Sequence, residues 1–228
     1  MRLDKYLCET TQLSRADAKK AILRGRVKVA DVLITNPAQK IDTTQTVLFD
    51  SAPLTLTGPL YIALHKPQGY ICSTLDEVYP CVLNLIEHEK KDKLHPAGRL
   101  DVDTTGLVLL TDDGQWSHRV TSPKKSCEKT YMVELAEPLR DDAAERCEQG
   151  IMLHNESKPT LPAKLELISP TQVKITLQEG KYHQVKRMFA ALDNKVIGLH
   201  RATIGQVDLT DLAEGEWRFL TAQEVAQF

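Results

Sequence analysis

The sequence predicts an α+β fold, with a small N-terminal domain followed by a larger domain built on a mixed, largely antiparallel sheet. Five strand-like segments, at residues 60–74, 106–112, 129–135, 163–169 and 172–177, are separated mostly by turns rather than by regularly alternating helices. Residues 51–59 are rich in proline and small polar residues, as is typical of a domain boundary. We therefore expect one domain at 1–58 and another at 59–228.

The first predicted helix carries a concentration of positive charge. Ala18, Ala21 and Ile22 form an apolar stripe at helical spacing. The helix begins at Ser14, with Asp17 in the capping-box position, and ends before Gly25. Residues 1–29 hold eight basic and three acidic side chains, a balance of +5, whereas the whole chain is at −2. This asymmetry favours a small polyanion-binding module. A solvated helix face is the alternative. The candidate contacts are Arg15, Lys19, Lys20, Arg24 and Arg26.

The segment GRLDVDTTGLVLLTDD, at residues 98–113, allows two interpretations. Its oxygen-bearing side chains fit the spacing of an EF-hand calcium loop, with Gly106 at the sixth position. Such a loop must follow a helix, but Pro96 and Gly98 prevent one here. Residues 107–110 form an aliphatic run that predicts a buried strand. We therefore do not expect a metal here, and the segment is either an acidic surface turn or a loop that presents one reactive carboxylate.

Composition limits the protein class. The chain is 42% hydrophobic and 26% charged, which is typical of a globular protein. We find no signal-peptide core and no membrane-length apolar run, so we expect a cytoplasmic protein without a membrane partner. The five cysteines are scattered without a CxxC pair, which again argues against a metal site.

A last helix is predicted at residues 182–192. Its apolar side chains follow helical spacing and form a core-facing stripe at Val185, Met188, Phe189 and Leu192. Lys186 and Arg187 must then lie toward the edge of that stripe.

Two stretches near the N-terminus, RLDKYL and LSRADAKKAILRGRVKV, resemble the S4 RNA-binding domain over residues 1 to about 50. This resemblance implies that the small domain binds RNA. One departure is Ala30-Asp31, where the family commonly has a glycine-containing hairpin turn, which makes the turn less favourable.

Four further segments resemble the pseudouridine synthases, in the branch that carries an S4 domain and modifies ribosomal RNA. They are LHKPQGYICST, HPAGRLDVDTTGLVLLTDDG, CEKTYMVEL and EGKYHQVKRMFAALDNKVIGLHR. Details such as DDGQWSHRVTSP look most like the enzymes of 16S rRNA. The resemblance implies an isomerase that needs no cofactor and acts, as a monomer, on 16S rRNA or on a small-subunit assembly intermediate.

The resemblance also implies the site residues. Asp101 matches the family's catalytic aspartate, which acts either as a nucleophile at C1′ or as a base at C2′ that generates a glycal. Lys186 matches the cation that keeps this carboxylate ionised, with Arg187 as the alternative. Tyr131 matches the stacking tyrosine. If the loop is extended, Asp103 points away from Asp101 and braces the loop.

Several other residues are expected at the RNA. Arg99 is expected to fill the gap left by a flipped base or to bind its phosphate, and Lys66, Gln68 and Arg187 to contact RNA. His65, where Asn is frequent, is not expected to be a ligand. Two alternatives stay open: a non-catalytic RNA-binding protein, and an enzyme acting on a large-subunit uridine.

Overall fold

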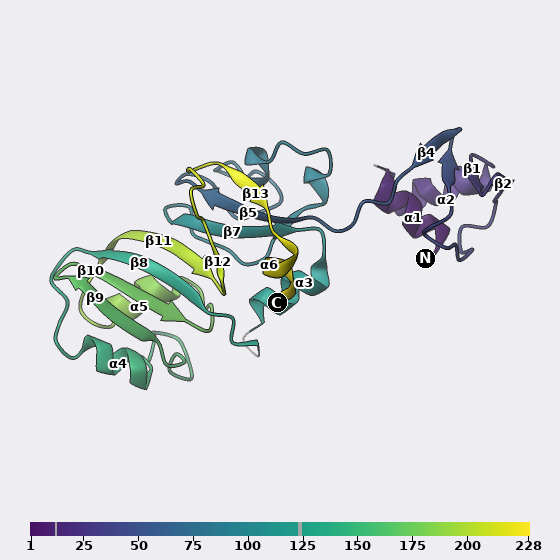
Figure 1. Cartoon of the computed structure of the whole chain (residues 1–228). Coiled ribbons are helices and arrows are strands. Elements are labelled where there is room, and N and C mark those ends of the chain that lie inside the picture. The colour runs from purple at the N-terminus through teal and green to yellow at the C-terminus, as the bar shows by residue number, and fades with distance from the viewer. Residues whose placement is uncertain (12, 123–124) are drawn as a thin grey trace. The chain divides into compact units, whose positions relative to one another are not determined.

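The computed structural model describes residues 1–11, 13–122 and 125–228. The chain forms two compact units, an N-terminal unit at Met1–Gly58 and a C-terminal unit at Pro59–Phe228 (Figure 1). Among the described residues, no helix is both long and apolar enough to cross a membrane.

The N-terminal unit packs two short helices against a small sheet whose strand order is β2-β1-β3-β4. The predicted helix forms, because the Ser14 hydroxyl accepts a hydrogen bond from the Asp17 amide at 3.2 Å and caps its first turn. Ala30 and Asp31 both adopt positive φ, of 47° and 64°, so the β1–β2 turn forms without glycine. The elements are α1 (Leu3–Thr10), α2 (Arg15–Leu23), β1 (Val27–Val29), β2 (Val32–Leu33), β3 (Val47–Phe49) and β4 (Ala52–Leu54).

The C-terminal unit is built on one sheet in the order β13-β5-β7-β11-β8-β10-β9. Of the described strand pairs, β7 with β11 is parallel and the others are antiparallel, which confirms the predicted mixed sheet. The strands are β5 (Tyr61–Lys66), β6 (His95–Pro96), β7 (Thr105–Thr111), β8 (Lys129–Leu135), β9 (Lys164–Ser169), β10 (Gln172–Leu177), β11 (Val196–Ile204), β12 (Val207–Asp208) and β13 (Trp217–Phe219). The helices are η1 (Val82–Leu85), η2 (Lys91–Lys93), α3 (Gly114–Thr121), α4 (Ala143–Gln149), α5 (Gln184–Ala190) and α6 (Ala222–Ala226).

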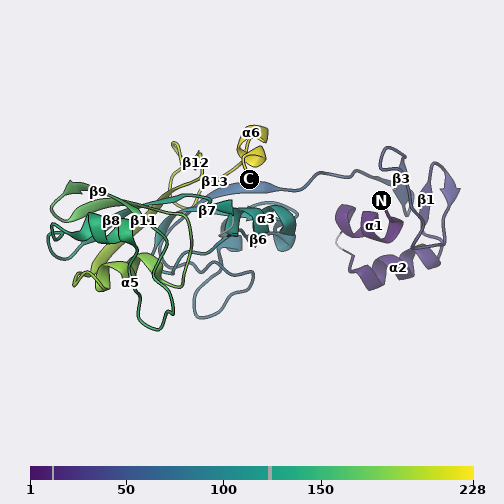
Figure 2. The same ribbon diagram turned by 90° about the horizontal axis from the view of Figure 1, so that it is seen from below.

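Both faces of this sheet are covered, which explains the aliphatic run in β7. Val108 and Leu110 enter the core that α5 covers, whereas Leu107 and Leu109 enter the core beside α3 and α6. Figure 2 shows α5 on one side of the sheet and α6 on the other. A strand that is buried on both faces needs apolar residues at every position rather than at alternate ones.

The parallel pair at the centre of the sheet depends on Gly106. This residue has φ +113° and lies opposite Arg201 of β11. A Cβ atom at this position would lie 2.3 Å from the Arg201 carbonyl oxygen. Only glycine therefore allows β7 to approach β11 here, and this approach carries the preceding loop to the middle of the sheet.

Candidate active site

A cleft of about 1230 Å³ lies within the C-terminal unit. Its lining includes the loop before β7, the strand β8, the segment that leads into α5, β11, and residues 71–73 and 77–79. The parallel pairing of β7 with β11 joins residues 95 positions apart in sequence, such as Thr105 and His200, and so helps to bring these parts together. Carboxylate, cationic and aromatic side chains thus meet in one concave site.

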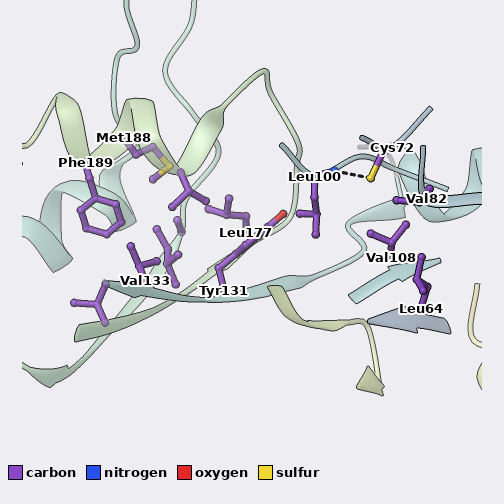
Figure 3. Packing of buried hydrophobic residues seen from close by; sticks show 14 of the residues in the cluster. Leu64, Cys72, Val82, Leu100, Val108, Tyr131, Val133, Leu177, Met188 and Phe189 are labelled. Carbon is purple, nitrogen blue, oxygen red and sulfur yellow. Dashed lines mark hydrogen bonds between the residues drawn. The ribbon is translucent and has the colours of Figure 1, made fainter. Parts of the chain in front are cut away.

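Asp101 lies in this cleft with its side chain 25% exposed. Its neighbour Leu100 is buried in the core, and the Leu100 amide lies 3.3 Å from the Cys72 sulfur, as Figure 3 shows. Burial of Leu100 anchors the loop, so the next side chain is presented to the cleft. The predicted reactive carboxylate is therefore accessible but not freely solvated.

Two cationic or polar groups hold the Asp101 carboxylate from different sides. Lys186 Nζ lies 3.0 Å from Oδ2, and His183 Nε2 lies 3.3 Å from Oδ1. Both groups belong to the segment that begins α5. A nearby ammonium favours the ionised form of a carboxylate, which is the form that either proposed reaction route requires.

Between the two candidate cations, the structure selects Lys186. Arg187 turns away from Asp101 and pairs with Glu156 at 3.0 Å, while it also donates to the carbonyl oxygens of Tyr182 and His154. Neighbouring residues on a helix point about 100° apart, so both cannot face one carboxylate. The expectation that Arg187 contacts RNA is accordingly not supported, because its donors tie α5 to neighbouring segments.

The predicted orientation of Asp103 is wrong. Its Oδ1 lies 2.7 Å from Lys186 Nζ, so the same ammonium bridges Asp103 and Asp101. The segment is a turn rather than an extended chain, since the Thr104 amide donates to the Asp101 carbonyl at 3.1 Å. The hydrogen bond from Lys186 lowers the pKa of Asp103. Burial lowers the pKa of Lys186, but the bonds to both carboxylates outweigh this effect and raise it.

Tyr131 forms one wall of the cleft. It lies on β8, is 8% exposed, and packs among core residues with its hydroxyl directed toward Leu100 (Figure 3). The Arg201 guanidinium, opposite it on β11, lies 6.0 Å from the ring centroid. A ring fixed in this way by strand pairing offers a rigid apolar surface to a planar ligand.

The expectation that Lys66 contacts RNA is wrong. Its side chain is fully buried at the end of β5, and Nζ donates to the carbonyl oxygens of Pro67, Val102 and Thr104. Burial lowers its pKa. Lys66 therefore braces the loop that carries Asp101 from beneath.

The other expected RNA contacts of this unit lie at the surface. Arg99 is exposed and lines the cleft, so it can reach a substrate there. Gln68 is exposed as well, and its amide donates to the Asp103 carbonyl at 3.2 Å. His65 donates from Nδ1 to the Leu212 carbonyl oxygen at 2.7 Å, outside the cleft lining.

The N-terminal candidates are all exposed: Arg15, Lys19, Lys20, Arg24 and Arg26. One of them is engaged within the unit, because Arg26 pairs with Asp50 and its guanidinium lies 4.6 Å from the centroid of the Phe49 ring. Lys20 lies 3.4 Å from Asp17, and both side chains remain more than half exposed. Such surface pairs are weak and leave the charge accessible to a polyanion.

Two cleft residues were not among the predicted site residues. Arg201 is 2% exposed and donates to the Leu107 carbonyl at 2.7 Å, and its Nη2 has no protein partner among the described residues. His183 contacts Asp101 directly. The sequence held a signal for His183, since it precedes Lys186 by three residues and helical spacing places such residues on one face.

Comparison with known proteins identifies relatives of both units. A family model described as RNA pseudouridylate synthase matches residues 60–191, and an S4 domain model matches residues 1–47. The ribosomal small subunit pseudouridine synthase A of Vibrio cholerae is 54% identical, covering 99% of this chain and 98% of its own. The protein of that name from Escherichia coli K12 is 53% identical, with 99% of both chains covered.

A solved structure agrees with these sequence matches. A crystal structure of a pseudouridylate synthase superposes with a TM-score of 0.72 at 48% identity. The match covers 100% of this chain and 99% of the other. The similarity thus extends over both units and is not limited to the site.

Proposed function

The chain belongs to the RNA pseudouridylate synthase family, and we propose that it converts one uridine of 16S ribosomal RNA, of the uridine-516 type, to pseudouridine. Relatives more than 50% identical over nearly their whole length carry the small-subunit name, which supports this substrate. The RNA is either free 16S rRNA or an assembly intermediate of the small subunit.

The observation that carries the proposal is the Asp101 carboxylate, held between Lys186 and His183 at the base of a cleft walled by Tyr131. The reaction breaks the bond from C1′ to N1 and forms one from C1′ to C5. Substrate and product are isomers, so this conversion consumes no second substrate. A carboxylate can start it by attack on C1′ or by removal of the C2′ proton.

Lys186 has an electrostatic role in either route. Its ammonium lies 3.0 Å from the Asp101 carboxylate, next to the position where charge changes during the reaction. Asp103 accepts a second hydrogen bond from the same ammonium and so fixes its direction. This arrangement is set before substrate binds, which limits the reorganisation required in the transition state.

The target uridine must leave its stack to reach Asp101. Extrusion costs a few kcal/mol, which stacking on an aromatic ring and filling of the gap in the RNA can offset. Tyr131 supplies the ring, and the exposed Arg99 at the rim of the cleft is the candidate to fill the gap or bind the phosphate. The S4-like N-terminal unit supplies further phosphate contacts through its exposed basic side chains.

Chemical mapping of pseudouridine in 16S rRNA tests this function. RNA from cells that lack the gene is expected to lose one pseudouridine, which wild-type protein restores and Asp101→Asn does not. Asp101→Asn should still fold and bind RNA, because it is isosteric. If no site in 16S rRNA changes and one in large-subunit RNA does, the substrate is wrong. If no rRNA site changes, the RNA-binding alternative replaces the enzyme.

A further inference from the structure

The bond that breaks in the proposed reaction leaves a negative charge on the base. The electron pair of the C1′–N1 bond stays with the uracil ring, while C1′ becomes bonded to the Asp101 carboxylate in one route or doubly bonded to C2′ in the other. The charge spreads from N1 to both carbonyl oxygens of the ring. A cation or hydrogen-bond donor beside the ring lowers the barrier to this step, because it acts on charge that develops in the transition state.

Arg201 lies between the two parts of the site that the flipped nucleotide must bridge. The strand β11 runs between β7 and β8, and its Arg201 pairs with Gly106 on one side and with Tyr131 on the other. Its Nη1 lies 3.4 Å from the Arg99 carbonyl oxygen, in the loop that carries Asp101, and 3.5 Å from the Tyr131 hydroxyl oxygen. A uridine whose sugar reaches Asp101 and whose ring stacks on Tyr131 therefore has this guanidinium beside its ring.

The guanidinium of Arg201 is buried with few acceptors. The residue is 2% exposed, and its Nε–H donates to the Leu107 carbonyl oxygen at 2.7 Å. The two Nη1 contacts are long, and Nη2 has no protein acceptor in the described part of the chain. No described carboxylate pairs with it, and those of the loop, Asp101 and Asp103, pair with Lys186 instead. Buried polar groups are normally satisfied, so this cation lacks a partner that a ligand can supply.

The backbone on both sides of Arg201 is shaped around this residue, whose side chain lines the cleft. The pairing of β11 with β8 shifts register between Arg201 and Thr203, as at a β-bulge. On the other side, Gly106 allows β7 to approach the Arg201 backbone. Bulges redirect a side chain and are common beside active sites. An arginine with a purely structural role would be expected to have acceptors for most of its N–H groups.

Other cations of the cleft are less suited to this charge. Lys186 already contacts two carboxylates, and Lys181 lies 2.9 Å from the carboxylate of a glutamate. Lys129 donates to a backbone carbonyl oxygen at 2.8 Å, and burial lowers its pKa. Arg99 is exposed, so water screens its charge. Arg201 is therefore the cation with the most unused donors beside the stacked ring.

We propose that Arg201 stabilises the uracil anion by donating from its guanidinium to a carbonyl oxygen of the ring, an inference that rests on the proposed pseudouridine synthesis. The guanidinium exchanges its long Nη1 contacts for this bond, since catalytic hydrogen bonds that are long in a free enzyme tighten when substrate binds. The charge is then stabilised in a site from which water is largely excluded, where a donor has its greatest effect.

The same donor can hold the detached ring while it turns. A half-turn about the line from N3 to C6 exchanges N1 with C5 and O2 with O4. Arg201 therefore meets a carbonyl oxygen before and after the turn, although the atom facing C1′ has changed. The uracil is retained in the cleft throughout, as rejoining through C5 requires.

The test uses full-length protein and 16S rRNA that carries either uridine or 5-fluorouridine at the target position. Fluorine withdraws electrons and stabilises the ring anion, so the fluorinated base needs less help to leave. Loss of the N-linked nucleoside is measured in single turnovers at saturating enzyme. We expect Arg201→Met to be roughly a hundredfold slower than wild type on uridine and less than about tenfold slower on 5-fluorouridine. Its affinity for the RNA should stay within about threefold of wild type.

Asp103→Asn is the matched control. It perturbs the site through Lys186 and not through the base, so its rate loss should be equal on the two substrates. Urea unfolding followed by tryptophan fluorescence establishes that each variant is folded.

Arg201→Lys provides the same test if Arg201→Met does not fold. It keeps the positive charge and can donate to the Leu107 carbonyl oxygen, as the buried Lys66 does to three carbonyl oxygens, but it lacks the forked nitrogens of arginine. We expect it to be about tenfold slower than wild type on uridine and within about threefold on 5-fluorouridine.

Three results would overturn the proposal. A rate of Arg201→Met on uridine within about threefold of wild type would mean that the guanidinium does not act in the reaction. A rate loss that is equal on both substrates, or that shrinks as much in Asp103→Asn, would mean that Arg201 only braces the loop and the sheet. A loss of affinity with unchanged turnover of bound RNA would indicate a phosphate contact instead.

Failure of the proposed function gives a different result. Wild-type protein would then form no pseudouridine in the RNA that carries uridine. If wild type converts this RNA and Asp101→Asn does not, the comparison of the two substrates in Arg201→Met concerns this inference alone.

Discussion

Lys186 Nζ lies 3.0 Å from Asp101 Oδ2, although 85 positions in the sequence separate the two residues. Asp101 belongs to the loop before β7, and Lys186 to the first turn of α5, which packs on the sheet through its apolar stripe. Because Val185, Met188 and Phe189 are buried, the helix cannot rotate, and Lys186 is held at the edge that faces the cleft.

Lys186→Met is expected to lose far more rate than affinity. The ammonium contacts Asp101 in the free protein, so its removal takes away charge stabilisation at the reaction centre, and we expect roughly a hundredfold slower turnover of bound RNA. Affinity should change by less than about threefold, since at most one phosphate contact is lost. Single-turnover kinetics and equilibrium binding on the same RNA separate the two effects.

Arg187→Met is the matched control, with a cation removed one position along the same helix. Its guanidinium pairs with Glu156 rather than with Asp101, so turnover of bound RNA should stay within about threefold of wild type while stability decreases. A larger loss of turnover in Arg187→Met than in Lys186→Met would reverse our assignment of the two residues.

Gly106→Ala is expected to destabilise the C-terminal unit by about 3 kcal/mol or more. The added Cβ would lie 2.3 Å from the Arg201 carbonyl oxygen, and the residue has φ +113°, which disfavours any side chain. Both tryptophans, Trp116 and Trp217, lie in this unit, so urea unfolding followed by tryptophan fluorescence reports on it.

Gly114→Ala serves as the comparison for that measurement. Gly114 is the first residue of α3, and a Cβ there would meet nothing within 4 Å. Its effect should be within about 0.5 kcal/mol of zero. Equal stabilities of the two variants would show that β7 can move away from β11 without cost, contrary to the close approach described above.

The sequence predicted elements wherever a local pattern sufficed. The Ser14 cap, the aliphatic run of β7 and the apolar stripe of α5 each follow from short-range physics, and all three are present. The helix α1 was not predicted, and no side-chain cap marks its start at Arg2. Its burial against the rest of the N-terminal unit is a tertiary effect that local sequence does not encode.

The errors at the site have a common origin in tertiary structure. Lys66 looks like a surface cation in sequence, but the end of β5 directs it under the loop, where three carbonyl oxygens meet it. Asp103 was expected to point away from Asp101 on the condition that the segment is extended. The segment instead forms a turn at Thr104, which brings the two side chains to the same side. Both side-chain positions depend on the path of the loop before β7, and residue type and spacing alone do not determine that path.

Glu224→Gln is expected to destabilise the C-terminal unit in a pH-dependent manner. Hydrogen bonds from Arg218, at 2.7 and 2.9 Å, are the main cause that lowers the pKa of Glu224 from 4.5 to about 2. A depressed carboxylate pKa stabilises the folded state above the unfolded pKa, and this contribution disappears as pH falls from about 4.5 toward 2. The variant should therefore be about 1 to 3 kcal/mol less stable at pH 7 and nearly equal to wild type near pH 2.

Urea unfolding of both proteins across this pH range, followed by tryptophan fluorescence, measures that difference. Trp116 donates to the Val225 carbonyl of α6 at 3.0 Å, so its environment responds to the helix that Glu224 caps. Glu148→Gln, at an exposed position of α4, is the control and should show less than about 0.5 kcal/mol at any pH. A difference that is constant with pH would mean that Glu224 acts through packing and not through its charge.

Neutralising exposed cations of the N-terminal unit is expected to reduce the salt dependence of RNA binding. Each phosphate that a protein neutralises contributes roughly 0.7 to 0.9 to the slope of log affinity against log salt. Replacing Arg15, Lys19 and Arg24 with glutamine should therefore lower that slope by about two to three units if each contacts one phosphate. Binding to 16S rRNA over a series of salt concentrations gives the slope directly.

The control for this variant removes the same charge from the C-terminal unit. Lys91, Lys158 and Lys195 are exposed and do not line the cleft, so their replacement with glutamine changes net charge equally without removing predicted contacts. Its slope should stay within about one unit of wild type. Parallel lines for the two variants would mean that affinity depends on net charge alone, and that the basic face of α2 is solvated rather than bound to RNA.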